Sequence, residues 1–211
     1  MKSTIVVYVH GLWVSGVEGY WLRRRVARAL GAESRAFSYS SVTGRAGDIA
    51  GALGKFLANL PADVLHIVAH SLGGVVVVKL FDDPPALPPG RIVLLASPVN
   101  GSHAAQNLAR FRLGRMMLGH TVQEELLPAR PRSWHGPREV GVIAGSAAYG
   151  LGRLVAALDE PNDGTILVAE TNLAGATDQI VLPISHSGML VSALAARQAA
   201  AFLRDGRFAK L

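Results

Sequence analysis

Ser71 is the residue of this chain whose surroundings most strongly indicate a nucleophile. It stands in Ala69-His70-Ser71-Leu72-Gly73-Gly74, after an apolar run over residues 64–69 and before an apolar helical pattern. A serine on a sharp turn between a strand and a helix projects its hydroxyl away from the backbone, and the turn needs small residues two positions before and after it. The adjacent helix N-terminus stabilises negative charge. The alternative interpretation is a serine that only caps the helix.

A serine hydroxyl is a weak nucleophile unless a base takes its proton. We predict that His186 is this base, because it follows the last apolar run and would lie at the same edge of a parallel sheet as Ser71. His66 lies within a strand pattern, and His70 adjoins the serine on a turn where neighbouring side chains diverge. The remaining histidines fall in the first loop or in a later insertion: His10, His103, His120 and His135.

The base needs a carboxylate that orients it and stabilises its charged form. We predict Asp163, in Asn162-Asp163-Gly164-Thr165, between the fifth and sixth strand patterns. Asp followed by Gly favours a turn from which the carboxylate can reach inward. An ordinary turn aspartate would look the same in the sequence, and three other acids compete for the role: Asp159, Glu160 and Asp178.

A developing oxyanion needs two donors that point at one position. We predict the backbone N–H groups of Leu72, just after the serine, and of Leu12, in the loop after the first strand. Gly11 would allow the backbone to approach closely, and His10 is expected to shape the loop. Trp13 is the predicted contact for the acyl or alcohol part of a substrate, although core or loop packing would explain it equally well.

Strand and helix patterns alternate along the chain, which is typical of a mostly parallel sheet with helices on both faces. The strand patterns cover residues 4–9, 34–39, 64–69, 91–96, 139–144 and 179–183. The helical patterns cover residues 19–30, 48–60, 72–81 and 187–203. We therefore predict an α/β fold with a six-stranded sheet, formed by residues 1–211 as one domain.

Residues 101–137 interrupt this alternation. They hold a helical pattern near 104–118, followed by a segment rich in proline, arginine and histidine. One interpretation is a small cap or lid over the carboxyl ends of the strands. The other is an ordinary crossover helix with a long loop.

Composition narrows the class of protein further. Half of the 211 residues are hydrophobic and only 17% are charged, which argues against disorder. The absence of cysteine excludes disulfides, thiolate metal sites and a catalytic thiol. Neither a signal peptide nor a membrane span is visible, so we expect a cytoplasmic protein. The net charge of +6 comes mostly from arginines without interleaved aromatics, and we expect no nucleic-acid partner.

Several segments together resemble the small α/β-hydrolases with lipase-like sequences. They are Val-His-Gly-Leu at 9–12, Ala-His-Ser-Leu-Gly-Gly at 69–74, Ala-Ser-Pro-Val-Asn-Gly-Ser at 96–102, Asn-Asp-Gly-Thr at 162–165 and Ser-His-Ser-Gly-Met-Leu at 185–190. The order Ser71, Asp163, His186 matches the order of the catalytic residues in that fold. The resemblance to minimal bacterial lipases implies a serine hydrolase that needs no cofactor or metal and acts on a small-molecule carboxylic ester.

The insertion is short and arginine-rich rather than a long apolar lid. We therefore favour a soluble esterase for small or medium acyl chains over an interfacial lipase. A thioesterase on acyl-CoA or acyl-carrier substrates is the nearest alternative, because basic residues would suit the phosphates of those carriers. A catalytically silent hydrolase fold that serves as a binding module is the alternative of another class. The oligomeric state does not follow from the sequence.

Overall fold

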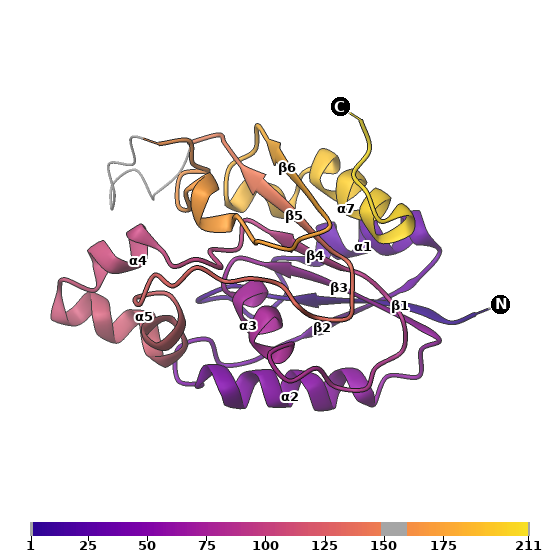
Figure 1. The fold of residues 1–211 in the computed structure, drawn as a ribbon, viewed down its shortest axis with the longest axis horizontal. Coiled ribbons are helices and arrows are strands. Elements are labelled where there is room, and N and C mark those ends of the chain that lie inside the picture. The colour runs from indigo at the N-terminus through magenta and orange to yellow at the C-terminus, as the bar shows by residue number, and fades with distance from the viewer. Residues whose placement is uncertain (1, 149–159, 211) are drawn as a thin grey trace.

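Six parallel strands form the centre of the molecule in a computed structural model that describes residues 2–148 and 160–210 (Figure 1). The strands are β1 (Thr4–Val9), β2 (Glu33–Phe37), β3 (Val64–His70), β4 (Ile92–Leu95), β5 (Val140–Gly145) and β6 (Asp178–Leu182). Their order in the sheet is β2-β1-β3-β4-β5-β6, and every neighbouring pair is parallel. The predicted six-stranded α/β fold is confirmed.

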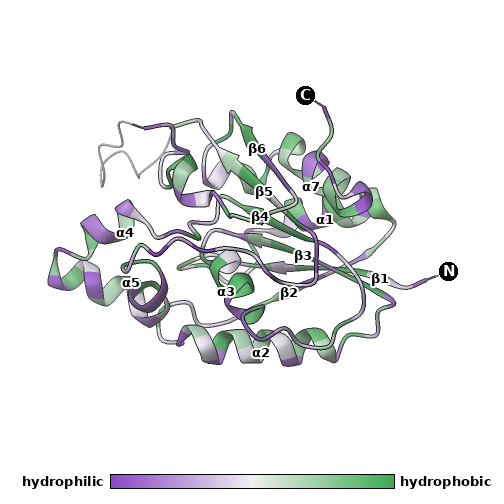
Figure 2. Cartoon of the chain, in the orientation of Figure 1, coloured by the Kyte–Doolittle hydropathy of each residue, from purple (hydrophilic) through white to green (hydrophobic). Residues whose placement is uncertain are grey.

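Helices cover both faces of the sheet, as parallel strands require. α1 (Tyr20–Leu30) packs against α7 (Ala193–Asp205) on one face, and α2 (Ala46–Ala58) packs against α3 (Leu72–Leu80) on the other (Figure 1). Each helix pair closes a separate apolar layer with the strands. The central strands are buried from end to end, which explains their nearly unbroken apolar sequences (Figure 2).

The turn between β3 and α3 is tightly packed against the end of β1 and the residues after β4. A Cβ at Gly73 would lie 2.4 Å from the carbonyl oxygen of Val9, and one at Gly74 would lie 2.1 Å from Ser97 Oγ. α3 then continues through four consecutive valines, residues 75–78, all of them buried. Valine disfavours helix intrinsically, so tertiary packing holds this helix.

The insertion differs from the expected single helix near 104–118. It forms α4 (His103–Leu108) and a longer α5 (Arg112–Glu125), separated by extended backbone at Phe111 (φ −96°, ψ 135°). The two helices meet where Gly114 lies against the Leu108 carbonyl, so closely that a Cβ there would be 2.2 Å from that oxygen. Helical periodicity does not report such a contact.

The insertion packs on the start of α3. Leu118, Val122 and Leu126 share an apolar cluster with Leu72 and Val75. Hydrogen bonds from the His120 N–H to the Val42 carbonyl and from Thr121 Oγ1 to the Gly44 carbonyl fix α5 to the loop before α2. The insertion therefore lies over the carboxyl edge of the sheet, and its movement as a lid stays a prediction.

The last helix was also expected too early, at residue 187. Residues Ser187–Leu190 form a separate 3₁₀ turn, η2, and α7 begins only at Ala193. Ser192 has extended backbone, and its side chain accepts a hydrogen bond from the Ala195 N–H at 3.1 Å. This cap sets the start of the helix and leaves residues 186–191 free to form the loop that carries His186.

None of the helices in residues 2–148 and 160–210 has the length and apolar character that a membrane span requires.

The packing of the turn gives a prediction for stability. Gly73→Ala should lower the free energy of unfolding by about 1–3 kcal/mol, because its Cβ would press on backbone carbonyls that cannot move independently. The matched control is Gly51→Ala, at an exposed position of α2 with nothing within 4 Å of the added Cβ. That change should stabilise the protein by about 0.5–1 kcal/mol. Urea unfolding measures both, and equal effects would contradict the packing argument.

His66 gives a second prediction, for the pH dependence of stability. Its Nδ1 accepts a hydrogen bond from the Arg91 N–H at 3.0 Å. Burial, together with the charge of Arg91, lowers its pKa from 6.5 to about 4. The unfolded chain therefore binds a proton that the folded chain does not, and the free energy of unfolding should fall as the pH drops from about 6.5 to about 4.

His66→Asn should remove about 2–3 kcal/mol of this acid sensitivity, since the amide oxygen can accept the same hydrogen bond without taking up a proton. The exposed His120→Asn is the control. Urea unfolding at pH 7 and pH 4 provides the comparison. An unchanged difference between the two pH values in the His66 variant would show that His66 is not a source of the effect.

Candidate active site

Ser71 has a strained backbone conformation, with φ 55° and ψ −126°. Non-glycine residues rarely adopt a positive φ, and such strain persists only where the surrounding structure enforces it. Here the Ser71 N–H donates to the Leu95 carbonyl at 2.9 Å, while the glycines of the turn lie against β1. The conformation places the serine between the end of β3 and the first residue of α3.

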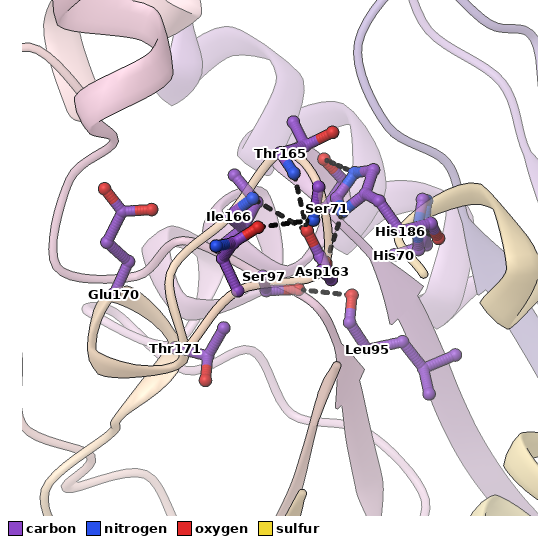
Figure 3. Close-up of polar contacts among 12 residues, drawn as sticks. His70, Ser71, Leu95, Ser97, Asp163, Thr165, Ile166, Glu170, Thr171 and His186 are labelled. Carbon is purple, nitrogen blue, oxygen red and sulfur yellow. Dashed lines mark hydrogen bonds and ion pairs between the residues drawn. The ribbon is translucent and has the colours of Figure 1, made fainter. Parts of the chain in front are cut away.

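Three polar side chains meet at this point (Figure 3). His186 Nε2 lies 3.1 Å from Ser71 Oγ, and His186 Nδ1 lies 2.8 Å from Asp163 Oδ2. An ionised carboxylate only accepts hydrogen bonds, so Nδ1 carries the proton and Nε2 is left to accept from the serine hydroxyl. This is the tautomer in which a histidine can remove a proton from serine.

Asp163 is buried and held by its own turn. Its side chain is 1% exposed, and its Oδ1 accepts from the N–H groups of Thr165 and Ile166 at 2.9 and 2.7 Å. Gly164 takes the positive φ of 92° that this turn requires. The second oxygen, Oδ2, is thereby directed to His186. These two backbone donors fix the orientation of the carboxylate, which suits a residue that orients a histidine.

The loops that carry the acid and the base are also joined through their backbones. The His186 N–H donates to the Asp163 carbonyl at 2.9 Å. At the end of β5, a Cβ on Gly145 would lie 2.4 Å from the Ile184 carbonyl and 2.7 Å from Asp163 Cβ. The absence of a side chain at Gly145 therefore lets both loops approach the sheet, and the contacts join the acid and the base into one unit.

His70 supports this unit although it was expected only to point away from Ser71. Its Nε2 lies 3.1 Å from the His186 carbonyl, and the two rings have their centroids 4.7 Å apart. Burial, and secondly the nearby His186, lowers the pKa of His70 to about 3. His70 is therefore neutral at physiological pH and donates to the carbonyl without placing a second charge beside His186.

The two predicted oxyanion donors belong to the residue after Ser71 and to the loop after β1. Neither the Leu12 nor the Leu72 N–H donates a hydrogen bond to any residue within 2–148 or 160–210. Gly11, the residue before Leu12, lies against Ser71, since a Cβ there would be 3.1 Å from Ser71 Cβ and 3.5 Å from Ser71 Oγ. The role of these donors stays a prediction.

His10 shapes this loop and does not contact Ser71 Oγ. Its Nδ1 lies 2.8 Å from the Gly11 carbonyl, and its Nε2 accepts from the Tyr39 N–H at 3.1 Å. The Tyr39 ring stacks on the imidazole with centroids 4.1 Å apart, and its hydroxyl donates to the His10 carbonyl. Two hydrogen bonds and a ring stack with Tyr39 thus hold the loop after β1 in place.

Trp13 follows the loop in an unusual position for a bulky residue, with φ 61° and a residue exposure of 55%. Its backbone N–H donates to Ser41 Oγ, and its indole Nε1–H donates to the Met117 carbonyl at 2.8 Å. Trp13 therefore links the loop after β1 to α5. Its predicted contact with substrate remains a prediction.

The alternative candidates for the base and the acid do not take part in the contacts around Ser71. His66 lines a cavity of about 480 Å³ at the opposite, amino-terminal edge of the sheet. Asp178 accepts from the Phe208 N–H at 2.8 Å, and Glu160 is exposed. Asp159 lies outside the described residues. Within the described ranges, no group of three or more histidine, aspartate or glutamate side chains could hold a metal ion.

Glu170 was missed at the sequence level. Its buried carboxylate accepts from the Leu167 N–H through Oε2, and from the His103 N–H through Oε1. The same Oε1 lies 2.8 Å from His103 Nδ1. Glu170 thereby ties the start of α4 to the segment that follows Asp163. Glu170 lies in a short 3₁₀ helix, η1 (Val168–Thr171). No sequence signal points to its contact with His103, because the two residues are 67 positions apart.

Comparison with known proteins agrees with the observed fold. Residues 6–208 match the model of the alpha/beta hydrolase family, and comparison with curated protein sequences finds no match to this chain. The mature form of the Bacillus licheniformis lipase BlEst2 is structurally similar, with a TM-score of 0.74 and 17% identity over 96% of this chain and 91% of that one.

Two further solved structures share the fold. The metagenomic carboxyl esterase MGS0156 has a TM-score of 0.61 and 19% identity over 88% of this chain and 65% of that one. The Vlm2 thioesterase domain has a TM-score of 0.56 and 15% identity over 97% of this chain and 94% of that one. At these identities the likeness extends to the fold alone. The family match covers nearly the whole sequence, and the chain belongs to the alpha/beta hydrolase family.

Proposed function

We propose that this protein is a serine hydrolase that cleaves carboxylic esters of small or medium acyl chains through an acyl-serine intermediate. The observation that carries the proposal is the chain of contacts from Ser71 Oγ through His186 to the buried Asp163, at 3.1 and 2.8 Å. A serine, a histidine in the required tautomer and an orienting carboxylate are the groups that this chemistry needs.

In the first half of the reaction, Ser71 Oγ attacks the acyl carbonyl carbon while its proton passes to His186 Nε2. The carbonyl electron pair moves to oxygen, where the N–H groups of Leu12 and Leu72 hold the negative charge. Asp163 stabilises the imidazolium. The tetrahedral intermediate then collapses, the bond to the leaving oxygen breaks, and His186 donates its proton to the departing alcohol.

In the second half, water replaces the alcohol. His186 takes a proton from the water as its oxygen attacks the acyl-Ser71 carbonyl, and the same two N–H groups hold the new oxyanion. Collapse of this intermediate returns the proton to Ser71 Oγ and releases the carboxylic acid. Every step uses groups of the chain and water.

Thioester hydrolysis is the second candidate, and two observations favour it. The Vlm2 thioesterase domain shares the fold, and exposed arginines at 110, 112 and 115 could bind the phosphates of coenzyme A or of an acyl carrier. The chemistry at Ser71 would be unchanged, with a thiol as the leaving group. A silent binding module is disfavoured, because it has no need of a serine, histidine and aspartate arranged for proton transfer.

The direct test is hydrolysis of p-nitrophenyl esters from acetate to palmitate. We expect turnover with a maximum at small or medium chains, and Ser71→Ala should lower kcat by a factor on the order of 10³ or more. Turnover of acyl-CoA but not of the esters would favour the thioesterase. Equal turnover by the wild type and Ser71→Ala would contradict the proposed mechanism.

The assignment of the acid is tested by a pair of matched variants. Asp163→Asn should lower kcat by a factor on the order of 10³–10⁴ with little change in KM, because the amide no longer holds His186 in the reactive tautomer. Asp178→Asn removes the same charge from an aspartate at the start of β6 and should leave kcat within about twofold of the wild type. The reverse result would transfer the role to Asp178.

A further inference from the structure

Exposed apolar side chains are concentrated at one edge of the molecule. Of the eleven large apolar residues that are exposed in the described part of the chain, ten lie at the carboxyl edge of the sheet. They follow β1, lie in the insertion, or follow the loop of His186: Trp13, Val14, Val17, Tyr20, Trp21, Phe111, Leu113, Met116, Met117 and Val191. The eleventh, Val181, belongs to none of these three segments and lies within the outermost strand, β6. Single exposed apolar residues are ordinary, but such a grouping marks an interaction surface.

Four of these residues lie in the stretch 110–117, here called the insertion tip. Phe111, Leu113 and Met116 are 69%, 65% and 70% exposed, and Met117 is 48% exposed. In α5 the buried Gly114 and Leu118 occupy the inward positions, so Leu113, Met116 and Met117 face outward, and Phe111 immediately precedes the helix. Figure 2 shows hydrophobic and hydrophilic stretches next to one another on this helix.

The insertion tip is also fixed in place beside the candidate site. The Trp13 indole donates to the Met117 carbonyl at 2.8 Å, which joins the tip to the loop that carries the Leu12 N–H. Leu118 packs in the same apolar cluster as Leu72, the residue after Ser71. A surface that bound the tip would therefore lie next to the two segments that carry Leu12 and Ser71.

The charge of the insertion tip indicates what kind of partner surface it would bind. Arg110, Arg112 and Arg115 are exposed, and none forms an ion pair with a residue that the structure describes. The two carboxylates of α5 are engaged with arginines outside the tip, Glu124 with Arg45 and Glu125 with Arg132, each at 2.5 Å. The tip thus exposes apolar side chains together with three arginines, and it contains no acidic residue.

A second copy of this chain is a poor partner for such a surface, because a symmetric dimer would place the same arginines against one another. An anionic lipid surface fits both properties, since it attracts arginines at its headgroups and accepts apolar side chains beneath them. We propose that the insertion tip and Trp13 dock this face on a membrane that contains anionic lipid. This departs from the soluble esterase favoured by the sequence, where only the arginines of the insertion were apparent.

The consequence of docking would be that Ser71 acts on acyl esters presented at the membrane surface. This consequence rests on the proposed function. The docking itself does not depend on catalysis. It can be measured with Ser71→Ala, which cannot consume the lipid by the proposed reaction. A failure of docking is therefore separable from a failure of the proposed function, which p-nitrophenyl ester turnover reports independently.

The experiment is sedimentation with vesicles of phosphatidylcholine, with and without phosphatidylglycerol, in the Ser71→Ala background. We expect binding to the anionic vesicles to be stronger by a factor on the order of 100, because each arginine near the surface contributes about fivefold. Phe111→Ser with Met116→Ser should weaken it by at least about tenfold. Replacing Arg110, Arg112 and Arg115 by Gln should remove the preference for anionic lipid.

Two controls match these changes. Val181→Ser removes the exposed apolar residue that lies away from the group, and Gln at Arg35, Arg204 and Arg207 removes the same number of charges at other positions. Both controls should bind as the parent does. The inference is overturned if the parent does not distinguish the two vesicles, if the controls lose as much binding as the tip variants, or if the tip variants change the oligomeric state and not vesicle binding.

Discussion

The close packing of the β3–α3 turn against the end of β1 is the constraint on which the rest of the site depends. Gly73 lies against the carbonyls of Val9 and His10, and Gly11 lies against Ser71. These contacts force Ser71 into a positive φ that a serine would otherwise avoid. The same contacts hold Gly11, just before the predicted donor Leu12, against the Ser71 side chain. A side chain at Gly73 would push the turn that carries Ser71 away from the end of β1.

A second constraint joins the acid and the base into one unit. The His186 N–H binds the Asp163 carbonyl while the side chains of the same two residues pair. Gly145 lets both loops approach the end of β5, and His70 holds the His186 carbonyl from the other side. Because parallel strands all end at one edge, this unit lies next to the β3–α3 turn although its residues are more than 90 positions away in the chain. The insertion is attached to the same edge through Leu118, Trp13 and Glu170.

The sequence predicted much of this arrangement because the relevant signals are local. The strand ranges agree with the structure to within a few residues, and the rule that parallel strands share an edge is enough to place Ser71, Asp163 and His186 together. Asp163 stood out among four acids through its Asp-Gly turn, and that turn is what holds its carboxylate.

What the sequence could not predict depends on contacts between distant segments or on close backbone approach. The division of the insertion into α4 and α5 follows from the contact of Gly114 with Leu108 and from the extended backbone at Phe111. The late start of α7 follows from the Ser192 cap, which an alanine-rich pattern conceals. Glu170 binds His103 across 67 positions. The exposure of Phe111 and Met116 was likewise invisible, because an apolar residue in a helical pattern is expected to be buried.

The central claim is that Ser71 is a nucleophile activated by His186. The most direct measurement is covalent labelling with a fluorophosphonate probe, followed by mass spectrometry of the modified peptide. The account predicts one phosphonylated residue, Ser71, with labelling lost in His186→Ala and in Ser71→Ala. Labelling at another residue, or labelling that persists without His186, would contradict it.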